Sequence, residues 1–176
     1  MSKIKMKNVR LSFPSLFQHA SFNGDSTGKY EATFVLDKVE HADTIKQIQA
    51  QANELMKTEL KSKLSSDRIC LKDGDELERE EFKGKMTIKA STKKRPLVID
   101  RDKSPLTEDD EKLYAGCYVN AILSLWAQNN GFGKRINAQL DGVQFNKDGE
   151  PFADSGISTD AFEAFEEDEL DDDIDF

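Results

Sequence analysis

The chain has 176 residues, of which 37% are hydrophobic and 34% are charged, and its formal charge at neutral pH is −9. This length suits a single compact domain with its own hydrophobic core, and the absence of any run of 18 apolar residues excludes a membrane-spanning helix. Residues 1–10 are not expected to be a secretory signal, and Cys70 and Cys117 lie in no metal-binding spacing, which favours a reducing cytoplasm and no cofactor.

The first third of the chain is predicted to begin with strands. Residues 1–17 alternate between apolar and polar side chains, and the alternation changes phase at Asn8, which predicts a β-bulge there. Pro14 is expected to end regular pairing. Residues 21–28 are rich in Gly, Ser, Asn and Asp and are expected to form a loop, and residues 29–36 have the period of a second strand.

A long amphipathic helix is predicted over residues 39–64, because apolar residues recur there every three or four positions. Residues 65–83 are polar and irregular. The period of a strand returns at residues 85–91. A basic cluster, residues 93–95, and a proline then precede a short apolar run at residues 97–99.

The last predicted elements are a short helix and a hairpin. Thr107, followed by four acidic residues, predicts a capped helix of one or two turns. Residues 117–126 and 132–145 are predicted strands, and the Asn-Asn-Gly sequence at residues 129–131 is typical of a hairpin turn. We expect Phe13, Phe34 and Phe145 to lie in the core.

These elements predict a mainly β fold. Strands dominate and do not alternate regularly with helices, which argues against a doubly wound parallel sheet. A five-stranded β-barrel of the OB-fold type, with one long helix packed across it, accounts for the pattern most simply. A mixed α+β sheet is compatible with the same pattern.

Charge is unevenly distributed along the sequence. Residues 154–176 hold 11 acidic residues and no Lys or Arg; removing these 11 from the 34 acids leaves 23 acids against 25 bases in residues 1–153, a formal charge of about +2. The sequence thus predicts a globular domain, residues 1–153, and an acidic tail. The tail is expected to be disordered, because its charges repel one another and its few apolar side chains cannot offset the chain entropy.

Basic side chains beside exposed aromatic rings point to binding of single-stranded nucleic acid, in which cations contact phosphates and bases stack on rings. Trp126 adjoins a polar turn and two cations, where deep burial is unfavourable, although a lone Trp is more often part of a core. The main candidate contacts are Lys85, Lys89, Lys93, Lys94, Arg95, Trp126, Phe132, Lys134 and Arg135. Further candidates, for which simple solvation of strand lysines is the alternative, are Lys3, Lys5, Lys7, Arg10 and Tyr118.

The tail ends with an apolar hook beside the terminal carboxylate. Such an acidic peptide with a terminal ring can mimic a nucleic-acid strand or anchor in a pocket of a partner, and a simple solubility tail is the alternative. The residues concerned are Asp171, Asp172, Asp173, Ile174, Asp175 and Phe176.

This ending resembles the acidic tip, closed by Phe, of bacterial and phage single-stranded DNA-binding proteins, although Asp175 stands where the bacterial form has proline. The segments Val9–Pro14, Arg95–Pro96 and Tyr114–Val119 resemble the phage-encoded, podovirus-type branch of these proteins. The resemblance implies an OB-fold domain that binds single-stranded DNA without sequence preference in phage DNA replication or recombination, in the cytoplasm of an infected bacterial cell. It also implies that the acidic tail competes with DNA and recruits replication or recombination proteins.

Three other functions are considered. An enzyme is not expected, because the two histidines, His19 and His41, lie in no catalytic or metal-binding spacing. A recombination protein that anneals complementary strands would share the basic groove. An acidic mimic of DNA that blocks a host enzyme would show no affinity for single strands.

Overall fold

The computed structural model describes residues 3–77 and 79–152. The predicted tail, including residues 171–176, and its expected disorder lie outside these residues. Within the described ranges, no helix is both long enough and apolar enough to cross a membrane.

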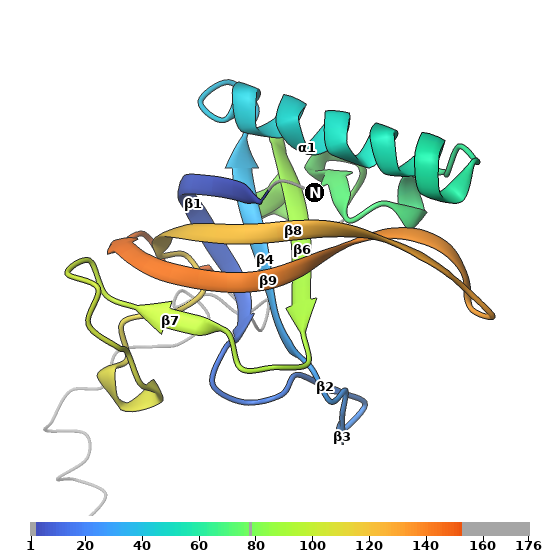
Figure 1. The fold of residues 1–176 in the computed structure, drawn as a ribbon. Helices are drawn as coiled ribbons and strands as arrows, with labels where there is room; N and C mark the ends of the chain where they lie inside the picture. The colour runs from blue at the N-terminus through green and yellow to red at the C-terminus, as the bar shows by residue number, and fades with distance from the viewer. Residues whose placement is uncertain (1–2, 78, 153–176) are drawn as a thin grey trace, which may run out of the picture.

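Five long strands form a closed barrel (Figure 1). In order around the barrel they are β1 (Ile4–Ser15), β4 (Tyr30–Asp37), β6 (Lys85–Thr92), β9 (Gly133–Lys147) and β8 (Tyr118–Asn130). Neighbours are antiparallel except for β6 and β9, whose short parallel pairing, with Ala90 opposite Ala138, closes the barrel. The predicted OB-like barrel is confirmed.

Shorter strands extend the sheet or cap its loops. Strand β5 (Leu71–Asp73) pairs with β6, and β7 (Leu97–Ile99) runs parallel to β9 at the other edge. A two-residue hairpin, β2 (Ser21–Phe22) and β3 (Asp25–Ser26), lies inside the predicted loop. The sequence pattern predicted neither β5 nor this hairpin.

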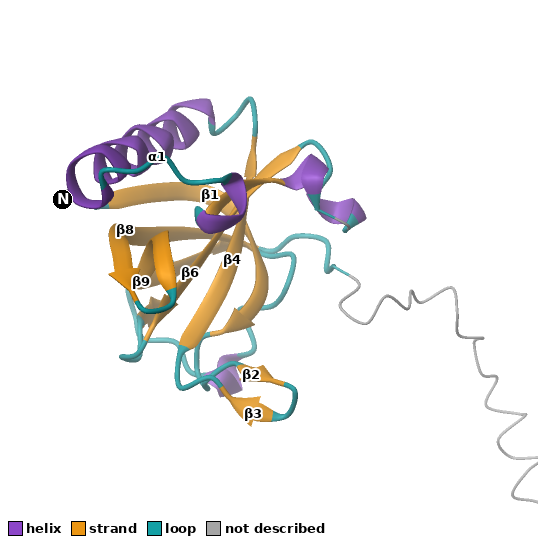
Figure 2. Cartoon of the chain, turned by 90° about the vertical axis from the view of Figure 1, so that its right-hand side faces the viewer, coloured by secondary structure: helices purple, strands orange, loops and turns teal. Residues whose placement is uncertain are grey.

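Helix α1 (Ala42–Leu55) lies across one end of the barrel, as both views show (Figures 1 and 2). Its buried face joins the barrel core through side chains that include Ile48, which is fully buried. A π-helical stretch, Met56–Leu60, continues it until Lys61 adopts a left-handed φ of 50°. The helical segment is therefore shorter at both ends than the predicted residues 39–64. Short 3-10 turns occupy Ser66–Arg68, Gly74–Glu76, Glu80–Phe82 and Glu108–Asp110.

Two irregularities in β1 decide which side chains face the core. The predicted bulge is present: Asn8 has a φ of 56°, and the register of β1 against β8 shifts between Met6 and Val9. The register against β4 shifts again between Ser12 and Ser15, so Pro14 interrupts the pairing but does not end it, because Ser15 still pairs with Glu31.

The second irregularity corrects one core prediction. Phe13 has a φ of 48° and turns outward, 40% exposed, with Arg79 stacked 4.3 Å from its ring centroid. Phe34 and Phe145 are buried, as predicted. The left-handed residue reverses the alternation on which the prediction for Phe13 relied.

The β8–β9 hairpin is the longest feature of the sheet and extends past the rest of the barrel (Figure 1). Its register is continuous toward the turn, with Trp126 opposite Asn137 and Asn130 opposite Gly133. Gly131 and Phe132 form the turn itself, which therefore begins later than the predicted Asn-Asn-Gly turn. The side chain of Asn130 supports this turn, since its Oδ1 accepts a 2.9 Å hydrogen bond from the backbone N–H of Phe132.

Candidate nucleic-acid interface

An open groove of about 730 Å³ lies beside the outer part of the β8–β9 hairpin. Trp126 and Phe132 line it from the hairpin, and Lys93 and Lys94 line it from the loop after β6. Lys29, just before β4, completes the cationic lining. The groove therefore brings together two aromatic rings and three lysines from three separate segments of the chain.

The rings in this groove are accessible. Trp126 is 44% exposed and Phe132 is 89% exposed, so neither belongs to the hydrophobic core. The hairpin that carries them is braced by polar side chains, because Asn137 donates a 2.8 Å hydrogen bond to Gln128 Oε1. Exposed rings on a braced hairpin can stack on bases without disturbing the fold.

A second hollow, of about 360 Å³, adjoins the groove and shares Lys29 and Ser91 with it. Its cations come from the outer faces of neighbouring elements, and one of them, Lys89, lies 3.4 Å from the carboxylate of Glu31. Across the two hollows, seven cations face two acids, and the local charge is strongly positive. The cations are Lys29, Arg68, Lys72, Lys89, Lys93, Lys94 and Arg135, and the acids are Glu31 and Asp67.

The first groove and the second hollow together are called the joint groove below. Its location in the barrel matches the place where OB-fold barrels bind their ligands. OB-fold barrels bind oligonucleotides on the face of their second and third strands, between the loop that joins strands one and two and the loop that joins strands four and five. In this barrel those strands are β4 and β6, and those loops are residues 16–29 and 131–132. The groove lies at this place.

Several predicted contacts lie elsewhere. Lys85 forms a 2.7 Å ion pair with Asp37, and this hydrogen bond holds the pKa of the Asp37 carboxyl well below its usual range. Arg10 and Tyr118 line the same separate hollow as Lys85, with the Arg10 guanidinium 5.6 Å from the Tyr118 ring centroid. Lys134 points to the end of the helical segment and donates to the backbone oxygen of Leu60 at 3.1 Å.

The remaining predicted cations are also outside the groove lining. Lys3 pairs with Asp141 at 2.9 Å, and Lys5 and Lys7 border another hollow, which is apolar. Arg95 is exposed next to Lys94 but lies 6.0 Å from the ring centroid of Phe17. For all these residues, a role in nucleic-acid binding stays a prediction without support from the groove.

Three cations in the joint groove were missing from the prediction. Lys29 precedes β4 and could have been found, because it ends the loop between the first two barrel strands. Arg68 and Lys72 lie in the irregular segment before and within β5, where the sequence shows no period. Only the pairing of β5 with β6 brings these two side chains beside Lys89.

Two side chains that can take part in chemistry, Cys70 and His41, lie in fixed surroundings. Cys70 lines the second hollow, but burial raises the pKa of its thiol to about 12, so it stays protonated at neutral pH. His41 is buried, and its ring is held between the backbone N–H of Asp37 and the backbone oxygens of Lys7 and Asn8. Among residues 3–77 and 79–152, no three metal-binding side chains gather.

A closed five-stranded barrel with rings and cations beside these two loops defines the OB-fold class of oligonucleotide-binding domains. Within this class the chain belongs to the family described as "Enterobacter phage Enc34, ssDNA-binding protein", whose model matches residues 2–174. The resemblance to phage single-stranded DNA-binding proteins is therefore confirmed.

Individual relatives agree with this family. Putative protein p50 of Acyrthosiphon pisum secondary endosymbiont phage 1 is 39% identical over 167 residues, which cover 89% of this chain and 90% of that protein. The single-stranded DNA-binding protein from bacteriophage Enc34, solved in complex with ssDNA, is 32% identical with a TM-score of 0.79, covering 86% of this chain and 89% of that chain. The gp2.5 single-stranded DNA-binding protein of bacteriophage T7 is 13% identical with a TM-score of 0.51, covering 90% of this chain and 98% of that one, and shows a similar fold alone.

Proposed function

We propose that this protein binds single-stranded DNA without sequence preference and acts by binding rather than by catalysis. The observation that carries the proposal is the joint groove, in which two exposed rings and seven cations line one continuous surface. Cations track a phosphate backbone and rings stack on any base, so this combination favours single strands and tolerates any sequence. The Enc34 relative solved with ssDNA supports the same conclusion.

A titration tests this proposal directly. The fluorescence of Trp126, the only tryptophan in the chain, is measured while an oligo-thymidine strand or a duplex of equal length is added, at two salt concentrations. Quenching by the strand at lower concentration than by the duplex, weakened by salt through counterion release, is expected. No quenching and no retention on immobilised oligonucleotide in dilute buffer would reject single-strand binding and would favour the DNA-mimic alternative.

We further propose that residues 154–176 compete with DNA for the cationic surface and recruit replication or recombination proteins during phage DNA metabolism in the infected bacterial cell. The 11 acids of this segment are tethered to the groove-bearing domain, which gives them an effective concentration of order mM. A bound strand would displace these acids from the cationic surface and make the tail available to a partner.

Deletion of residues 154–176 tests the competition. The truncated chain should bind oligo-thymidine more tightly than the full chain, most at low salt, where charge is least screened. A matched variant keeps the length of the tail but replaces its Asp and Glu by Asn and Gln; it should behave like the truncation. Equal affinity of all three chains would refute competition while leaving single-strand binding intact.

A further inference from the structure

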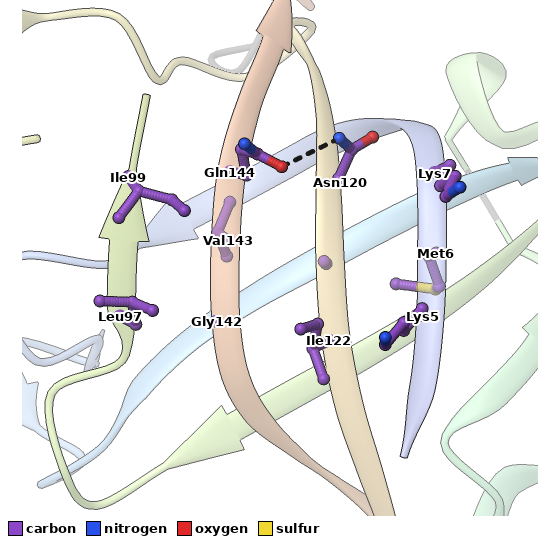
Figure 3. A pocket seen from close by; sticks show the side chains of 11 residues that line it. Lys5, Met6, Lys7, Leu97, Ile99, Asn120, Ile122, Gly142, Val143 and Gln144 are labelled. Atoms are coloured by element: carbon purple, nitrogen blue, oxygen red, sulfur yellow. Dashed lines mark hydrogen bonds between the residues drawn. The ribbon is translucent and has the colours of Figure 1, made fainter. Parts of the chain in front are cut away.

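A small apolar hollow of about 210 Å³ lies on the outer face of the barrel, away from the groove. Figure 3 shows how Leu97 and Ile99 approach it from β7 and Ile122 from β8, with β9 between them. Leu97 is 64% exposed and Ile122 is 36% exposed, although both are large aliphatic side chains. Gly142 of β9 places no side chain over the floor, where an added Cβ would meet Leu97 only at 3.4 Å or more.

Two lysines border this hollow on its β1 side. The side chains of Lys5 and Lys7 are exposed, and neither Nζ has a hydrogen-bond or ion-pair partner among residues 3–77 and 79–152. At the end of the hollow next to Lys7, Asn120 donates a 3.2 Å hydrogen bond to Gln144 Oε1, which closes that end with amides (Figure 3). The hollow therefore combines an aliphatic floor with free positive charge on one side.

This combination fits one aromatic ring that carries carboxylates beside it. A cavity of about 150 Å³ lined by aliphatic side chains accepts benzene, so a hollow of this size has room for one phenyl group. Residues 171–176 supply such a group, because the ring of Phe176 closely follows the carboxylates of Asp173 and Asp175 in the sequence. We propose that residues 171–176, the tip of the acidic tail, dock here, with the Phe176 ring in the hollow and the carboxylates of Asp173 and Asp175 on Lys5 and Lys7.

The tip can reach the hollow from the point where the described chain ends. Phe152 is held beside β1, with the Arg10 guanidinium 4.1 Å from its ring centroid and its N–H bonded to Ala115 O at 3.0 Å. From Arg10 to Lys5 along β1 the distance is roughly 17 Å, at about 3.3 Å per residue. A chain of 24 residues, the length of residues 153–176, spans at most about 80 Å when fully extended, well beyond this distance.

The hollow is a different site from the DNA groove. Ile122 and Trp126 both face outward on β8, roughly 13 Å apart at four strand residues. Between them, the carboxylate of Asp141 accepts hydrogen bonds from Ser124 at 2.5 Å and from Lys3 at 2.9 Å. A tip docked in the hollow would leave the rings of Trp126 and Phe132 open, so this docking can fail or succeed independently of single-strand binding.

Methyl NMR of the full-length chain tests the docking without DNA. Signals of Leu97, Ile99 and Ile122 should be displaced upfield by the ring current of Phe176, and Phe176→Ala should remove this displacement. Phe165→Ala, which alters another ring of the same tail, should leave the displacement intact. Lys5→Glu with Lys7→Glu should also remove it, because both side chains are exposed and their replacement spares the core.

Other outcomes overturn the proposal. If the signals of Trp126 were displaced instead of those of the three aliphatic residues, the tip would be placed in the groove. Displacement that disappears on dilution of the protein would assign the ring to a second copy of the chain. Displacement that appears in Phe176→Ala only when oligo-thymidine is added would assign the hollow to nucleic acid. Methyl signals that do not respond to Phe176→Ala would exclude the docking altogether.

Discussion

Truncation of Phe132 to alanine isolates the stacking contribution to DNA binding. The side chain is 89% exposed at the hairpin turn, so Phe132→Ala removes a ring and almost no core packing. The turn itself should persist, because Asn130 accepts its hydrogen bond from the backbone of residue 132 and not from the ring. A stacked base contributes about 1–3 kcal/mol, which at 1.4 kcal/mol per factor of ten predicts a loss of about 5- to 150-fold in affinity.

The assay is the Trp126 titration with oligo-thymidine, since Phe132→Ala keeps this probe. Thermal unfolding should be nearly unchanged, as for other substitutions at exposed positions. Val39→Ala is a matched control: Val39 is 86% exposed but lies beside α1, outside the groove, and its replacement should not change affinity. If Phe132→Ala bound within about twofold of the unaltered chain, the stacking role of the hairpin turn would be refuted.

Three further predictions concern cations and a thiol. Lys93→Gln with Lys94→Gln should lower the slope of log affinity against log salt by about 1.4, at about 0.7 for each phosphate that is no longer neutralised, whereas Lys46→Gln on the exposed side of α1 should leave it unchanged. Lys134→Gln should lower the free energy of unfolding by about 1 kcal/mol in denaturant titrations, with a smaller effect on affinity than the Lys93 and Lys94 pair, because Lys134 bonds the end of the helical segment. Burial raises the pKa of the Cys70 thiol to about 12, so this thiol should resist alkylation at pH 8 until the chain is unfolded. The contribution of Cys70 to stability is complete below its ordinary pKa of 9.0 and is lost as pH rises towards 12. The variant Cys70→Ala should therefore show a smaller fall in stability between pH 9 and pH 12.

The barrel could be predicted because its long strands and helix bury side chains at regular intervals. The alternation in β1 even located the bulge at Asn8. Strand β5 and the β2–β3 hairpin could not be predicted in this way, since two or three residues hold no period. Their pairing depends on neighbours such as β6 that are distant in sequence.

The sequence indicated several residues that line the groove, but it could not indicate the register of the strands, which decides which side chains face it. Successive strand residues face opposite sides, so Lys134 and Arg135 could not both face the groove, and the structure selects Arg135. Lys85 and Lys89 share a face, yet only Lys89 lines the groove, because the register of β4 against β6 places Asp37 opposite Lys85. Such choices depend on the pairing of separate strands, which a single sequence does not reveal.

A net charge of −9 would be expected to repel DNA. Screening by salt explains why the protein can still bind DNA, because charges act only over a limited distance. At physiological ionic strength the screening length is about 8 Å, so a phosphate at the groove responds mainly to the seven cations and two acids that line it. In dilute salt the screening length grows to about 30 Å, and the 11 acids of residues 154–176 then act on the same phosphate. Counterion release and tail repulsion thus oppose each other as salt falls. The full chain should therefore gain less affinity in dilute salt than the chain without residues 154–176, although both use the same groove.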